Sequence, residues 1–316
     1  MQKIDLAKKH WQWLAMLFLS LVWGSSFILM KKGLQSYSFD QVAAFRMLFA
    51  STFMLPLAIR HLNILTKKDT LPLMLVGLLG FAIPAFLFTK AQTQINSSLA
   101  GMLNSLTPLF TLLIGLAFYQ SKVKMIGIIG ILVGLAGAIG LIYKPGLNIL
   151  SGFNLYALFV VAATICYGIN VNILKYRLSH LGAVQITAVS FLFVGPVSGI
   201  YLLFTDFSGV AQTPDYILNL AYIAILALFS SAIAIIVFNA LIKHTTAIFA
   251  TSVTYVIPLV AIFWGMADGE AIGAKHFVWM VIILAGVFLV NRESEARKQG
   301  IGSVKKIVNL GMGKKI

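Results

Sequence analysis

The residues best able to do chemistry in this sequence are amides, hydroxyls and aromatic rings that interrupt long apolar stretches. Polar groups in an apolar environment are costly, so they tend to face a cavity or a partner. The candidate solute-binding residues are Trp23, Ser26, Asn104, Ser105, Tyr167, Asn170, Asn239, Thr254 and Tyr255. We favour the three asparagines, because Ser and Thr often bond to their own backbone and aromatic rings often serve packing.

Arg46 is the one charged residue clearly inside an apolar stretch, about 9 Å from the start of its helix at the α-helical rise. A cation there could hold a carboxylate, which would suit an amino acid or another organic anion. A structural pairing, or a side chain that extends to the nearer membrane interface, explains the same residue. We favour these two structural explanations over contact with a solute.

The residue types that enzymes and metal sites need do not occur in suitable patterns. The chain lacks HExxH and GxSxG, its five histidines have no ligand spacing, and Cys166 is a lone cysteine. No Asp or Glu lies deep in an apolar stretch, which argues against proton coupling through a buried acid and favours exchange or facilitated diffusion. We therefore expect neither an enzyme nor a metal or cofactor.

Composition defines the environment of these residues. Hydrophobic residues make up 59% of the 316-residue chain and charged residues only 10%, whereas soluble domains average about 25% charged. A water-exposed surface cannot be built from so little charge, and 23 Phe exclude a disordered chain. Lipid must surround most of this protein.

A helix needs about 20 apolar residues to cross a bilayer. The hydropathy predicts ten such spans, and no segment alternates as a barrel strand would. They lie near 11–31, 40–59, 71–90, 96–118, 123–143, 153–175, 183–204, 216–241, 246–266 and 275–291. The first is too long for a signal-peptide core and no cleavage site follows it, so we expect it to remain in the protein.

The formal charge of +15 lies in short clusters between spans and in a basic tail over 292–316. This distribution indicates a membrane surface and excludes a nucleic-acid partner. If the N-terminus is cytoplasmic, 18 of the 24 Lys and Arg residues fall on the cytoplasmic side. The positive-inside rule therefore predicts a multi-pass protein of the cytoplasmic (inner) membrane with both termini in the cytoplasm.

The ten spans divide into two sets of five, over 11–143 and 153–291. A shift of 150 residues places Asn104 on Thr254, Ser105 on Tyr255 and Pro108 on Pro258. Because five is odd, the two sets would have opposite orientations in the membrane. Inverted repeats are a common plan of secondary transporters, whose substrate site lies at mid-membrane between the repeats.

These features resemble the EamA-type ten-helix transporters of the drug/metabolite transporter superfamily. The resemblance rests on Trp23-Gly24-Ser25-Ser26-Phe27, Arg46, the prolines 108 and 258, and Gly269-Glu270. It implies two five-helix repeats and export of amino acids or other small metabolites. The sequence departs from the family at Tyr119-Gln120, where Gly-Glu is common.

We therefore expect alternating access at a central cavity, with Pro108 and Pro258 as candidate hinges. The alternatives within transport are a nucleotide-sugar carrier and a lipid-linked-sugar flippase; outside it, a membrane enzyme or a scaffold. The glycines 127, 130, 134 and 137 form a close-packing helix face. We expect that face to pack within the chain of a monomer, with a homodimer contact as the alternative.

Overall fold

The computed structural model describes residue 6 and residues 8–62, 66–119, 125–143, 154–245 and 247–290. The predicted basic tail over 292–316 lies outside the described residues. In the described part of the chain, every secondary-structure element is a helix, and there is no β-sheet. This confirms the predicted all-α fold class.

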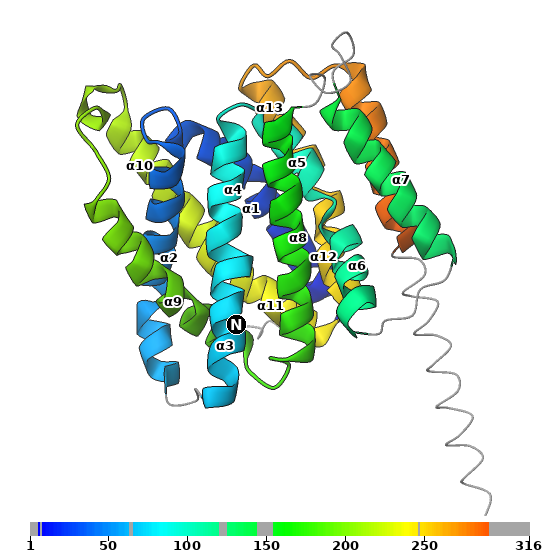
Figure 1. Cartoon of the computed structure of the whole chain (residues 1–316), viewed down its shortest axis with the longest axis horizontal. Coiled ribbons are helices and arrows are strands. Elements are labelled where there is room, and N and C mark those ends of the chain that lie inside the picture. The colour runs from blue at the N-terminus through cyan, green and yellow to red at the C-terminus, as the bar shows by residue number, and fades with distance from the viewer. Residues whose placement is uncertain are drawn as a thin grey trace, which may run out of the picture.

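The first half of the chain forms five membrane-length helical stretches (Figure 1). The third stretch contains a π-helical segment, and the fourth is broken after its first two turns. In order they are α1 (Lys9–Gly33), α2 (Phe39–His61), α3 (Lys67–Leu75) continuing through π-helical Val76–Ala82 into α4 (Ile83–Gln92), α5 (Ser97–Asn104) followed by α6 (Thr107–Tyr119), and α7 (Met125–Ile142).

The second half repeats this arrangement. It consists of α8 (Leu155–Tyr176), α9 (Ala183–Leu203), α10 (Tyr216–Ile225) continuing through π-helical Leu226–Ile233 into α11 (Ala234–His244), α12 (Ala247–Thr251) followed by 3-10 helical Ser252–Tyr255 and α13 (Ile257–Ala267), and an apolar helix Ala274–Val290. A short 3-10 helix, Val210–Gln212, lies in the loop before α10.

Nine helical stretches of the described chain are long and apolar enough to cross a membrane. The tenth, Ala274–Val290, is shorter, and its described part reaches about 25 Å at the α-helical rise. Large apolar side chains such as Leu132, Leu203 and Phe263 lie exposed on the outside of the bundle. A lipid environment accounts for this exposure, because proteins in water rarely expose large apolar patches.

Two irregular features recur at the 150-residue shift that the sequence suggested. The π-helical segments Val76–Ala82 and Leu226–Ile233 occupy corresponding positions in the two halves. The break between α5 and α6 corresponds to the 3-10 turn Ser252–Tyr255 before α13. Such interruptions in membrane helices are tolerated where they line a cavity or are buried in protein.

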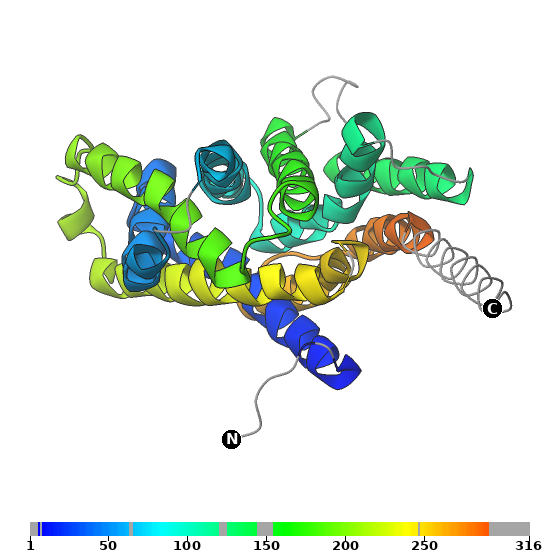
Figure 2. The ribbon, with the colours of Figure 1, turned by 90° about the horizontal axis from the view of Figure 1, so that it is seen from below.

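The glycine face of α7 packs inside the chain, as expected. Figures 1 and 2 show α7 beside the apolar helix Ala274–Val290 at one edge of the bundle. A Cβ atom at Gly286 would overlap the backbone of Gly134, and one at Gly130 would overlap that of Gly286. These glycines allow the two backbones to approach closely, which is how membrane helices pack without a hydrophobic driving force.

Candidate functional site

A cavity of about 100 Å³ lies in the middle of the bundle and is lined by residues of both halves. At about 10–15 Å³ for a water molecule, this volume holds several waters or a compact solute. Eight of the residues singled out from the sequence line it. They are Trp23, Ser26, Arg46, Asn104, Tyr167, Asn170, Asn239 and Thr254.

Two other candidates lie elsewhere. Ser105 is buried directly after α5, and its hydroxyl donates to the Met102 carbonyl. Tyr255 is partly buried and packs against the main apolar core. The break between α5 and α6 separates Ser105 from Asn104, so the structure places only the asparagine at the cavity.

The candidate hinges Pro108 and Pro258 each occupy the second position of a helix, α6 and α13 respectively. Proline is favoured in the first helical turn because its missing N–H has no helical partner there. The chain therefore bends in the residues that precede each proline, at 105–106 and 252–256. Both bends border cavity-lining residues, Asn104 and Thr254.

The position of Arg46 follows from the start of α2. Ser38 and Gln41 form a reciprocal capping box that fixes the first turn of this helix, and Arg46 lies two turns further along. Its Nε donates to Ser231 Oγ over 2.7 Å, and its Nη1 lies 3.7 Å from Met30 Sδ. Only 9% of the residue is exposed. The side chain thus does not extend to the membrane interface.

The π-helical segments contribute cavity residues that the sequence analysis missed. Gly80 and Phe81 come from the first segment, and Ser230 and Ser231 from the second. Ser231 accepts the bond from Arg46, while Trp23 Nε1 donates to the Ser230 carbonyl over 3.0 Å. π-Helical turns often occur at functional sites. The sequence feature that could have identified them is the pair of adjacent serines, Ser230 and Ser231, within an apolar run.

The asparagines differ in how their amides are used. Asn239 Nδ2 donates to Thr187 Oγ1 over 2.9 Å, and Asn172, outside the cavity lining, bonds to the carbonyls of Thr111 and Gly168. The Oδ1 atoms of Asn104 and Asn170 are buried without a hydrogen-bond partner among the described residues. Buried polar atoms normally have partners, so these two oxygens call for a donor from a solute or water.

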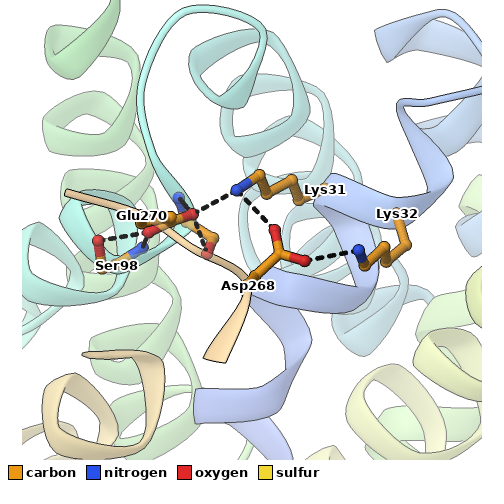
Figure 3. A network of polar contacts seen from close by, with 6 residues as sticks. Lys31, Lys32, Ser98, Asp268 and Glu270 are labelled. Carbon is orange, nitrogen blue, oxygen red and sulfur yellow. Dashed lines mark hydrogen bonds and ion pairs between the residues drawn. The ribbon is translucent and has the colours of Figure 1, made fainter. Parts of the chain in front are cut away.

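A network of charges lies at one end of the bundle, and Figure 3 shows its side chains from close by. Lys31 Nζ lies 2.7 Å from Asp268 Oδ2 and 2.9 Å from Glu270 Oε1, and Lys32 Nζ lies 2.6 Å from Asp268 Oδ1. The Glu270 carboxylate also accepts bonds from the backbone N–H and hydroxyl groups of Ser97 and Ser98. It thereby caps α5, whose first N–H groups lack helical partners.

Glu270 lies outside the membrane-spanning helices, in the loop after α13. Burial alone would raise the pKa of its carboxyl group. Hydrogen bonds from Ser98, Lys31 and Ser97 outweigh burial and hold the pKa at about 2. Glu270 is therefore a salt-bridge partner of Lys31, and its carboxyl group is ionised at neutral pH.

The opposite end carries a smaller polar contact. His180 Nε2, in the loop after α8, lies 3.0 Å from Asp69 Oδ1 in α3. Thr66 Oγ1 donates to the other carboxylate oxygen over 2.6 Å. Below, the two ends are called the Glu270 end and the Asp69 end.

Comparisons with known proteins identify the family. The EamA-like transporter family model matches the chain twice, over residues 10–143 and 154–292. The uncharacterized inner membrane transporter YedA of Escherichia coli is 29% identical over 279 residues, covering 87% of this chain and 89% of its own length. A Streptantibioticus cattleyicolor protein named "Probable terminal-alkyne amino-acid exporter" is 23% identical over 301 residues, covering 94% and 97%.

A solved structure has the same fold. It superposes with a TM-score of 0.63 at 15% identity and covers 89% of this chain and 96% of its own. The matched relatives and the family are transporters, and the helices, the cavity and the recurring interruptions suit that activity. The chain belongs to the EamA-like transporter family and is a multi-pass membrane transporter of small molecules.

Proposed function

We propose that this protein is a secondary transporter that exports amino acids or related small metabolites across the cytoplasmic (inner) membrane. The observation that carries the proposal is the central cavity, which combines Arg46 with amides and aromatic rings from both halves of the chain. A site between two structurally similar halves suits alternating access, in which one half rocks against the other. The Streptantibioticus cattleyicolor relative, which is named "Probable terminal-alkyne amino-acid exporter", supports the substrate class and the direction.

The orientation follows from charge. Most Lys and Arg residues flank the Asp69 end or lie in the C-terminal tail, so this end faces the cytoplasm together with both termini. The Glu270 end then faces outward. The inner-membrane location agrees with the relative YedA.

The cavity favours a compact solute over a nucleotide-sugar or a lipid-linked sugar. Its volume is about 100 Å³, and Arg46 is the one cationic side chain among its described lining residues. A diphosphate would require a larger and more basic pocket. The described residues that line the cavity include no Asp or Glu, so we expect transport by exchange or facilitated diffusion without a proton relay.

The direct test is amino-acid counterflow into proteoliposomes that contain the purified protein and a mixed amino-acid pool. Counterflow without an imposed proton gradient is the expected result. Strict dependence on the gradient would contradict the proposed coupling. Absence of amino-acid counterflow, in protein whose fold is verified by circular dichroism, would reject the proposed substrate class.

Asn104→Ala should lower counterflow about three- to tenfold, the usual range for the loss of one hydrogen bond to a solute. Ser105→Ala is the matched control, because the Ser105 hydroxyl is bonded to the Met102 carbonyl away from the cavity. Equal rates for Asn104→Ala and the wild-type protein would remove Asn104 from the transport site.

A further inference from the structure

Arg46 is a buried cation without an acidic partner among the described residues. The ion pairs in that part of the chain involve Lys31, Lys32 and His180, and none includes Arg46. Its two polar contacts, to Ser231 and Met30, use two of the five N–H groups of a guanidinium. A charge in this position is strongly disfavoured unless an anion or water completes its coordination.

The surroundings of Arg46 are suited to a carboxylate. The guanidinium is planar, and its parallel N–H groups match the two oxygens of a carboxylate. The bond from Nε to Ser231 Oγ restricts the rotation of that plane. Because Arg46 lines the cavity and none of the other described lining residues is an acid, we expect the counter-ion to arrive with the solute.

The same cavity offers acceptors for a positive group. Asn104 and Asn170 each present a buried Oδ1 atom without a described donor. They lie on α5 and α8, in different halves of the chain. An ammonium group has three N–H donors and no acceptor, which matches two neutral oxygens in a cavity without a carboxylate.

Apolar rings provide room for the remainder of the solute. Trp23 packs edge-on against Phe238 with ring centroids 5.0 Å apart, and Phe88 stacks near Tyr167 at 6.1 Å. All four rings line the cavity. These rings can pack against an uncharged side chain of the solute. They offer no salt-bridge partner to a charged side chain.

We propose that Arg46 binds the carboxylate of the transported solute and that Asn104 and Asn170 accept hydrogen bonds from its ammonium group. The site therefore selects zwitterionic α-amino acids over amines that lack the carboxylate and over carboxylates that lack the ammonium. This inference rests on the proposed function, and it assigns the residues that bind the carboxylate and the ammonium group of the substrate.

The first test uses three ligands that share one side chain: L-leucine, 4-methylpentanoate without the ammonium, and 3-methylbutylamine without the carboxylate. Ligand-induced thermal stabilisation of the purified protein reports binding independently of transport. The expected order of affinity is leucine, then 4-methylpentanoate, with the amine at least tenfold weaker than leucine. An amine that binds as tightly as leucine would overturn the proposal, as would absence of stabilisation by leucine and by every other amino acid tried.

The second test uses variants. Arg46→Gln should weaken leucine and 4-methylpentanoate at least tenfold, whereas Arg60→Gln, an exposed residue on the same helix, should bind like the wild-type protein. Asn104→Leu and Asn170→Leu should weaken leucine but not 4-methylpentanoate. Equal losses for the two ligands would overturn the assignment of the ammonium. If Arg46→Gln does not fold, Arg46→Lys keeps the charge but loses the planar fork, and it should show a smaller loss.

The two proposals fail in different ways. Amino-acid counterflow that persists unchanged in Arg46→Gln would reject the role of Arg46 and leave the transport function intact. Binding of leucine that requires Arg46, without counterflow in proteoliposomes, would reject amino-acid transport and leave the site assignment intact.

Discussion

The two ends of the bundle join the halves of the chain by different chemistry. At the Glu270 end, Lys31 and Lys32 of the first half pair with Asp268 and Glu270 of the second, over 2.6–2.9 Å. At the Asp69 end, His180 of the second half lies 3.0 Å from Asp69 of the first. Stacking of Tyr119 on Tyr176, with centroids 4.4 Å apart, adds an apolar contact there.

The ionic contacts also differ in the exposure of the basic partner. The side chains of Glu270 and Asp69 are both buried, at 2% and 6% exposed. The Lys31 side chain is 31% exposed, whereas that of His180 is 54% exposed. Solvent screens exposed pairs far more than buried ones. The Glu270 end therefore joins the halves by more ionic contacts, with a less exposed base, and the alternating access proposed above would require this network to open.

The largest effect should follow from Glu270→Ala, which removes an ion pair and the cap of α5 together. We expect a loss of about 2–4 kcal/mol in the free energy of unfolding. The reason is that Lys31 and the donor groups of Ser97 and Ser98 lose their acceptor. The probe for access to the cavity is a cysteine introduced by Asn104→Cys in a protein that also carries Cys166→Ala. In the Glu270→Ala variant, this cysteine should be labelled about tenfold faster from the Glu270 end than it is with Glu270 present.

Lys275→Ala is the control for this experiment, because Lys275 is an exposed charge near the same end. Unfolding can be followed in mixed detergent micelles, and labelling with a membrane-impermeant maleimide. If Glu270→Ala labels at the wild-type rate while it loses stability, the network stabilises the fold without restricting access to the cavity.

The two lysines should separate the roles of the acids. Lys31 contacts both Asp268 and Glu270, whereas Lys32 contacts Asp268 alone. Lys31→Ala should therefore cost about 1–2 kcal/mol and Lys32→Ala less than about 1, since both lysines are partly exposed. In double-mutant cycles with Glu270→Ala, the change in unfolding free energy caused by Lys31→Ala should be non-additive, and that caused by Lys32→Ala should be additive. Equal coupling would contradict this assignment.

Sequence reasoning was most successful where lipid dictates the pattern. The spans, the all-α fold and the chain-internal glycine packing follow from hydropathy and from small residues at helical spacing. Eight of the polar or aromatic residues that line the cavity were identified because polar groups in apolar helices are rare. Contacts between distant segments could not be found in this way. The cap that Glu270 provides for Ser97 and Ser98 joins residues more than 170 positions apart.

Local backbone geometry explains where the structure places side chains differently from the regular helical pattern. Ser105 follows Asn104 directly, yet the break after α5 directs its hydroxyl to the Met102 carbonyl. Arg46 has the sequence surroundings of a side chain that reaches the interface, but Ser231 in a π-helical segment holds it at the cavity. Periodicity assumes a regular helix, so it fails where helices are interrupted.

The smallest effects should come from pH at the Glu270 end and from His180 at the Asp69 end. The pKa of Glu270 is lowered to about 2, so its contribution to stability is complete above the ordinary value of 4.5 and is lost only as the pH falls through 2. The Glu270 end should thus be unchanged between pH 8 and pH 5.5. His180→Gln should change the free energy of unfolding by less than about 1 kcal/mol, because the His180 side chain is 54% exposed and solvent screens exposed contacts.

Glutamine can keep a hydrogen bond to Asp69, so cysteine labelling at the cavity from the Asp69 end should proceed at nearly the same rate in His180→Gln as in the wild-type protein. The labelling rate from the Glu270 end should be constant between pH 8 and pH 5.5. A rate from the Glu270 end that changed over this range would mean that Glu270 takes up a proton during opening. That outcome would restore proton coupling, with Glu270 as its site, because the carboxylate loses its lysine and serine donors when the network breaks.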